Sequence, residues 1–192
     1  MTGYENYQGM KERVKIYNNI INTDTSQKLK IIYNTASCWA CSYVSPAGPN
    51  EQGGQNEFII PAIRLDQIIK EDVLLLKIDV EGYEVRALES AFEALRTHDV
   101  GNILIEWAPK RWGSLHPIQS GTQILEQIYD LGYRIYHYDL RMEYPQTGLT
   151  MQEFPGRVRA WEIPRQKLGH MNDYLAKEAS YGEANLWITK EY

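Results

Sequence analysis

Residues 75–91 read LLKIDVEGYEVRALESA, and the fold follows from the way an apolar run in this stretch ends in carboxylates around one glycine. Strand interiors avoid Asp and Gly, because neither packs well on a pleated surface. We therefore predict a strand over residues 73–80, with Asp79, Glu81 and Gly82 at its exit. Open α/β sheets bind their ligands beyond such exits.

The segments that follow predict a second strand joined to the first by a helix. Residues 84–98 carry an apolar stripe at helical spacing, typical of an amphipathic helix, and residues 103–105 are a short apolar run that ends at Glu106. Continuous apolar runs are typical of strands buried on both faces. We expect 73–79 and 103–107 to be adjacent parallel strands in the interior of the sheet.

The rest of the chain alternates strands and helices. Helices are predicted over 11–21, 65–70, 124–131 and 166–177, and strands over 29–33, 39–44, 58–63, 134–140, 158–163 and 185–189. The strands at 39–44 and 58–63 flank a glycine-rich loop and could pair as a hairpin. This order predicts an α/β fold with a parallel sheet and right-handed crossovers.

Size and charge limit the classes of protein. A chain of 192 residues is suited to one domain. The net charge of −5 argues against nucleic acid as a partner. No apolar run approaches the roughly 20 residues of a membrane span, and the polar N-terminus is unlike a signal peptide. We expect a cytoplasmic protein that binds neither nucleic acid nor membrane.

Two cysteines, Cys38 and Cys41, form a C-x-x-C motif that could indicate redox or zinc chemistry. Zinc would need two further ligands, and the four histidines show no paired spacing. A redox pair would open a helix, whereas strand and turn residues follow Cys41. We expect reduced thiols and no metal site.

Acidic residues at the two strand exits are the candidate catalytic groups. Asp79 and Glu81 follow one strand and Glu106 ends the next, so their carboxylates could converge and raise one another's proton affinity. Such a group would serve as a general base or bind a divalent metal. Alternatively, Asp79 or Glu81 only caps the following helix.

Gly82 and His116 each have two interpretations. Gly82 allows either a tight turn with positive φ or close approach to a ligand. His116, in the loop after Glu106, could accept a proton near neutral pH, or could simply be solvated.

The series Arg64-Leu65-Asp66, 77–84 (KIDVEGYE), 87–91 (ALESA) and 103–106 (ILIE) resembles the signature of FkbM-type S-adenosylmethionine-dependent methyltransferases, with matching spacing over residues 58–107. The resemblance implies a Rossmann-like sheet with an antiparallel last strand, here 185–189. It implies S-adenosylmethionine as cofactor and a small-molecule or sugar hydroxyl as acceptor. It also implies that Asn34, Thr35, Ala36 and Ser37 lie near the adenine, and that Asp79, with Gly82, lies near the reacting methyl group.

The chain departs from this family at the cofactor cradle, because it contains no G-x-G and has too few residues before Asn22 for the first strands. We expect a sheet that lacks those strands and is completed by a partner chain or an upstream segment. The chain alone should then bind S-adenosylmethionine weakly or not at all. The alternative function is a non-catalytic α/β remnant that binds a partner or a small ligand.

Overall fold

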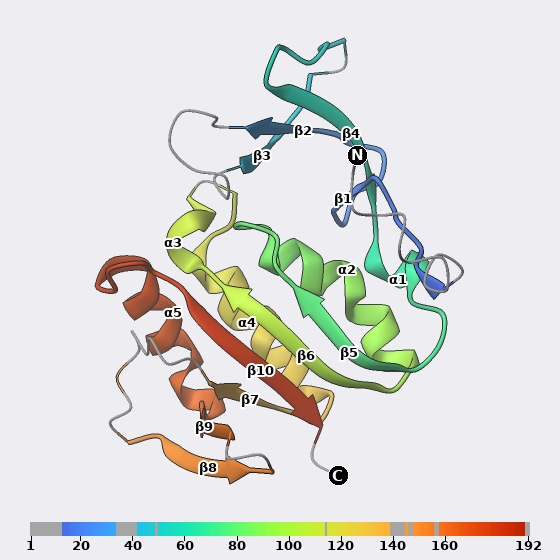
Figure 1. Ribbon diagram of the computed structural model, residues 1–192. Helices are drawn as coiled ribbons and strands as arrows, with labels where there is room; N and C mark the ends of the chain where they lie inside the picture. The colour runs from blue at the N-terminus through green and yellow to red at the C-terminus, as the bar shows by residue number, and fades with distance from the viewer. Residues whose placement is uncertain are drawn as a thin grey trace, which may run out of the picture.

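The computed structural model describes residues 13–33, 42–48, 50–113, 115–138, 145, 148–155 and 158–190 (Figure 1). Its strands are β1 (Ile20–Ile21), β2 (Lys28–Tyr33), β3 (Ser42–Pro46), β4 (Glu57–Ile63), β5 (Val73–Ile78), β6 (Val100–Trp107), β7 (Tyr133–His137), β8 (Thr150–Phe154), β9 (Val158–Glu162) and β10 (Ala184–Lys190). Its helices are α1 (Leu65–Ile68), α2 (Glu84–Thr97), α3 (Pro109–Trp112), α4 (Ile118–Asp130) and α5 (Leu168–Lys177), and a 3-10 turn, η2 (Arg165–Lys167), precedes α5.

The larger of two sheets has the strand order β5-β6-β10-β7-β9-β8. β5 and β6 are parallel neighbours, which confirms that prediction, and Ile78 lies opposite Ile105. β10 lies between β6 and β7 and runs antiparallel to both, as predicted for the last strand. The sheet is therefore mixed, because β10 separates two strands that share a direction and β8 and β9 add an antiparallel pair.

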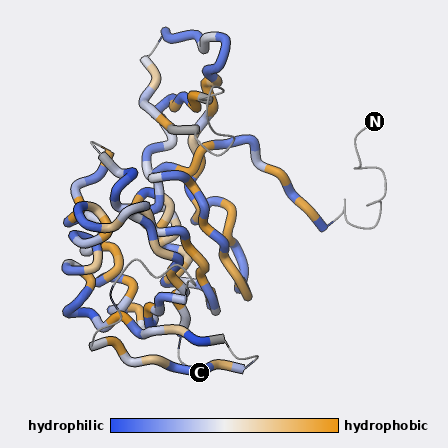
Figure 2. Tube along the Cα trace, turned by 60° about the vertical axis from the view of Figure 1, so that its left-hand side comes forward, coloured by the Kyte–Doolittle hydropathy of each residue, from blue (hydrophilic) through white to orange (hydrophobic). Residues whose placement is uncertain are grey.

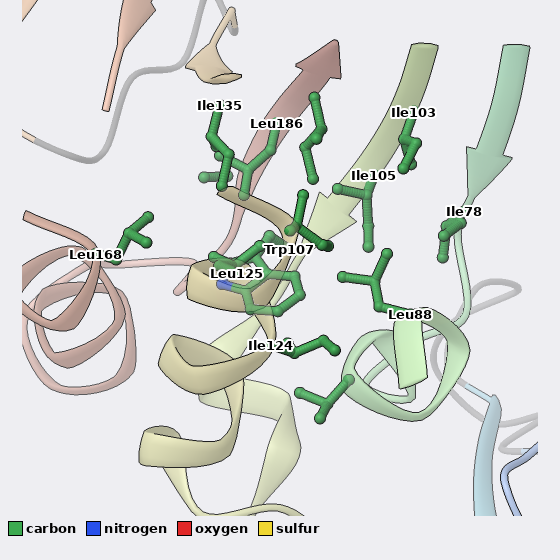
Figure 3. Close-up of a cluster of buried hydrophobic side chains, with 14 of the residues drawn as sticks. Ile78, Leu88, Ile103, Ile105, Trp107, Ile124, Leu125, Ile135, Leu168 and Leu186 are labelled. Carbon is green, nitrogen blue, oxygen red and sulfur yellow. The ribbon is translucent and has the colours of Figure 1, made fainter. Parts of the chain in front are cut away.

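The core lies between this sheet and the helices α2, α4 and α5, which cover one of its faces (Figure 1). Helix α2 contributes Leu88 and helix α4 contributes Leu125, and both side chains pack against Ile105 and its neighbours (Figure 3). The apolar stripe predicted for 84–98 is buried in this layer. Each apolar side chain buried in this way contributes about 1.5–3 kcal/mol.

The smaller sheet has the order β1-β4-β2-β3 and lies at the end of the molecule where β5 and β6 terminate (Figure 1). Its own apolar cluster joins Ile20 and Leu29 to Tyr83, which follows β5. Val80 packs against the cores of both sheets. The smaller sheet therefore sits over the exit of β5.

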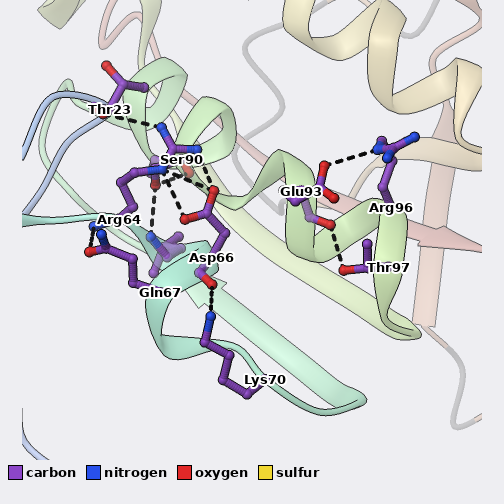
Figure 4. Close-up of polar contacts among 11 residues, drawn as sticks. Thr23, Arg64, Asp66, Gln67, Lys70, Ser90, Glu93, Arg96 and Thr97 are labelled. Atoms are coloured by element: carbon purple, nitrogen blue, oxygen red, sulfur yellow. Dashed lines mark hydrogen bonds and ion pairs between the residues drawn. The ribbon is translucent and has the colours of Figure 1, made fainter.

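Polar contacts fasten α1 and the chain after β1 to α2 (Figure 4). The Leu65 N–H donates to Ser90 Oγ at 3.3 Å. Arg64 forms an ion pair with Asp66 and also donates to the Thr23 carbonyl at 3.2 Å. These contacts hold the smaller sheet in place against the larger one.

Three predictions about the N-terminal third are wrong. Residues 14–19 form no helix: their apolar side chains are exposed, the segment runs out from the sheets (Figure 2), and Ile20–Ile21 pair with β4. β3 and β4 do not form a hairpin, because both pair with β2. The strand predicted at 39–44 is β3, and residues 39–41 lie outside the described part.

β5 is also not an interior strand. It is the edge of the larger sheet, and Leu74 and Leu75 are 84% and 51% exposed. The prediction failed because the described N-terminal strands form a sheet of their own instead of pairing with β5. Strand β8, whose residues are mostly exposed and polar, was not predicted.

Candidate functional site

The turn after β5 has an unusual backbone conformation. Glu81 has φ +51°, the only positive φ of a non-glycine residue in the described ranges, and Gly82 has φ +100°. A Cβ on Gly82 would lie 3.3 Å from the Arg111 carbonyl oxygen. Gly82 is therefore required both by its φ and by the close approach of α3.

Glu84 holds this turn, and the sequence analysis did not single it out. Its carboxylate is 1% exposed and accepts hydrogen bonds from the Gly82 N–H and from the Trp112 indole N–H, each at 2.7 Å. Burial raises the pKa of this carboxyl group. The residue at the N-cap of α2 is Tyr83, so neither Asp79 nor Glu81 caps the helix.

Arg111 gathers the carboxylates at the strand exits, and it too was not predicted. Its guanidinium forms ion pairs with Glu81 and with Glu183, the latter at 3.0 Å, and lies 3.8 Å from Glu106 Oε1. Asp79 pairs with Lys77 at 2.8 Å. Because the carboxylates of Glu81 and Glu106 share one cation, the structure brings these two predicted residues together.

The electrostatics of Glu106 also show this convergence. Burial raises the pKa of its carboxyl group, and the negative charges of Glu183 and Asp79 raise it further. Like charges that are close together make each carboxylate a better proton acceptor. In the described ranges no group of three or more His, Cys, Asp or Glu side chains could hold a metal ion.

His116 is buried and not solvated, being 5% exposed. Its ring lies edge-on to Tyr83 and Trp112, with centroids 6.0 and 6.5 Å apart, and its Nε2 has no hydrogen-bond partner in the described residues. Burial, with a smaller effect of Arg86, lowers the pKa of the imidazole to about 4. A side chain that is this weakly basic is a poor proton acceptor at neutral pH.

This burial predicts acid sensitivity. Between pH 6.5 and 4 the unfolded chain binds a proton on His116 that the folded protein does not bind, so stability is lost as the pH falls. The loss at pH 5 is about 2 kcal/mol, at about 1.4 kcal/mol per pH unit. Urea unfolding of His116→Phe between pH 7 and 5 should show this loss removed.

The matched control is the half-buried His98, at the end of α2. His98→Phe should keep the acid sensitivity of the wild type. Equal pH dependence in wild type and His116→Phe would show that His116 is not the responsible group.

A pocket of about 230 Å³ lies between the smaller sheet and the turn after β5. Its lining residues are Asn19, Ile20, Ile21, Ile31, Val44, Asp79, Val80, Glu81 and Tyr83. The two carboxylates thus lie beside apolar walls contributed by both sheets. The predicted cofactor residues 34–37, and Cys38 and Cys41, lie outside the described residues.

Carboxylates beside a pocket at the exit of parallel strands define an α/β protein with its ligand site at the end of the sheet. The model of the methyltransferase FkbM domain matches residues 8–135, about two thirds of the chain. The chain therefore belongs to the FkbM methyltransferase family, as the motifs in residues 58–107 indicated. Searches of curated proteins and of solved structures gave no match. None of the helices in the described ranges is long and apolar enough to cross a membrane.

Proposed function

We propose that the protein transfers a methyl group from S-adenosylmethionine to a hydroxyl group of a small molecule or sugar. The observation that carries the proposal is the convergence of Glu81 and Glu106 on Arg111 beside a pocket that Asp79 also lines, in a chain of the FkbM family. The cofactor supplies an electrophilic methyl group on a positively charged sulfur. The carboxylates of Asp79 and Glu81 suit such a charge electrostatically.

In this mechanism the acceptor oxygen attacks the methyl carbon while the carbon–sulfur bond breaks, and the hydroxyl proton passes to a protein side chain. Glu106 is the best proton acceptor of the predicted residues, because burial and its acidic neighbours raise its pKa. Asp79 lies closest to the methyl group, and Glu81 faces the same pocket. His116 is a weaker choice, since its imidazole is already poorly basic.

Residues 34–37 complete the proposed site at the adenine end. They connect β2 to β3, and Ile31 of β2 and Val44 of β3 line the pocket. The pocket of about 230 Å³ is smaller than sites that enclose a whole ligand, which are typically about 300–1,000 Å³. This size agrees with the expectation that the chain alone binds the cofactor weakly, and it also favours the second candidate, a non-catalytic module that binds a smaller ligand.

The experiment is calorimetric titration of the chain with S-adenosylmethionine, comparing wild type with Asp79→Asn. We expect millimolar binding by the wild type and at least about tenfold weaker binding by the variant, since a hydrogen bond to a charged group contributes about 1.5–3 kcal/mol. Asp173→Asn is the matched control, because Asp173 is also an exposed aspartate paired with a lysine, on α5.

The outcomes separate the candidates. Binding that Asp79→Asn leaves unchanged would remove Asp79 from the site. No binding by the wild type at millimolar cofactor would favour the non-catalytic module.

A further inference from the structure

The outer edge of β5 is an uncovered strand edge. β5 pairs with β6 on one side, and within the described ranges no strand pairs with its other side. Proteins usually protect such edges with proline, bulges or charges. Residues 73–76 are instead Val-Leu-Leu-Leu, with Leu74 and Leu75 largely exposed.

The edge continues into an apolar groove on the face of the sheet opposite α2, α4 and α5. The groove has a volume of about 630 Å³ and is lined by Leu74, Leu75, Asn102, Leu104, Tyr138, Phe154, Pro155 and Trp187. The Phe154 and Trp187 rings are in edge-to-face contact at 4.5 Å, and the Trp187 indole N–H donates to Asn102 Oδ1 at 2.9 Å. Its walls are therefore well ordered, and contiguous exposed apolar surface of this kind marks an interaction site.

The direction of the backbone groups defines how another strand can add to β5. The Val73 N–H donates to the Asp99 carbonyl next to β6, at 2.8 Å. Because successive residues of a strand point their backbone groups to opposite sides, the N–H and C=O of Leu74 point away from β6. Leu74 can therefore exchange both hydrogen bonds with a residue placed directly opposite.

The sequence around Leu74 is complementary to itself in the antiparallel direction. With Leu74 opposite Leu74 of a second copy, Glu71 lies opposite Lys77 and Val73 opposite Leu75. Opposite charges and apolar pairs directly across two strands stabilise the pairing. The same contacts occur twice about the two-fold axis, as an isologous interface requires.

We propose that two copies of this chain associate by antiparallel pairing of their β5 edges, centred on Leu74. The two larger sheets then form one continuous sheet, and Leu74 and Leu75 of both copies are covered. The second copy is the partner chain that completes the sheet. Residues 1–12 are an unsuitable alternative occupant, because their sequence, MTGYENYQGMKE, has no apolar run.

The first test is sedimentation velocity over a concentration series from micromolar to submillimolar. The wild type should show a concentration-dependent dimer. Glu71→Lys and Lys77→Glu should each weaken dimerisation by about tenfold, because each replaces two attractive pairs with two repulsive ones. The double charge swap should restore it. Glu93→Lys, which breaks an exposed ion pair with Arg96 on α2, should leave it unchanged.

A second test does not depend on charge. In a Cys38→Ser, Cys41→Ser background, Leu74→Cys should form an intermolecular disulfide under mild oxidation, since residues directly opposite in such a pair have Cα atoms about 5.5 Å apart. The exposed control Tyr181→Cys should crosslink far more slowly. A wild type that stays monomeric throughout, a charge swap that fails to restore the dimer, or equal crosslinking of both cysteine variants would overturn the proposal.

Discussion

The Trp112→Ala variant is expected to lose about 3–5 kcal/mol of unfolding free energy, the usual result of deleting a buried tryptophan ring. Trp112 is fully buried and lies edge-to-face against Trp107, with ring centroids 4.9 Å apart. Its indole N–H is also one of the two donors to the buried Glu84 carboxylate. The substitution therefore leaves a cavity and removes a partner from a buried charged group.

Urea unfolding followed by circular dichroism measures this loss. Trp112→Phe is the matched variant, because it keeps most of the packing and removes the N–H; it should cost about 1–3 kcal/mol, the usual penalty for a buried group left unpaired. A loss below about 1 kcal/mol for Trp112→Ala would contradict the packing described for this ring. Equal stability of Trp112→Phe and the wild type would show that the bond to Glu84 contributes nothing.

The Gly121→Ala variant is expected to be destabilised by about 1–3 kcal/mol or more, although alanine is the better helix former by about 1 kcal/mol. Gly121 lies in α4, and a Cβ there would stand 2.2 Å from Trp112 Cη2, 2.5 Å from its Cζ3 and 3.0 Å from Trp107 Cζ2. Both rings are fully buried, so neither can move away without disturbing the core.

Gly169→Ala is the control for this prediction. Gly169 lies in α5, and its added Cβ would meet only Thr122 Cγ2 at 3.9 Å, an ordinary contact. This variant should be as stable as the wild type or up to about 1 kcal/mol more stable. Thermal unfolding of both variants compares them directly, and a Gly121→Ala protein as stable as Gly169→Ala would contradict the close contact between α4 and Trp112.

The elements that were predicted from sequence are those with a strong local pattern. Helix α2 follows from its apolar stripe, and β6 from a short apolar run. The strand-to-helix turn at 79–84 follows from carboxylates and a glycine where a strand must end. The resemblance of this segment to the FkbM family was confirmed for the same reason, since the motif is local in the sequence.

The elements that were mispredicted depend on partners far away in the chain. Residues 14–19 have helical spacing, but no surface receives their apolar side chains, while Ile20 and Ile21 pair with β4 about forty residues later. The run at 73–78 has the composition of an interior strand, and a strand becomes an edge only through what its neighbours do.

By itself the sequence determined which residues end β5 and β6, and hence that Asp79, Glu81 and Glu106 lie at one end of a sheet. The tertiary structure alone decided what those carboxylates meet. Arg111 and Glu183 reach them from α3 and from the start of β10, and Glu84 is held by Trp112, 28 residues away. The physical reason is range: backbone pattern is encoded within a few residues, whereas ion pairs and burial depend on how distant segments pack.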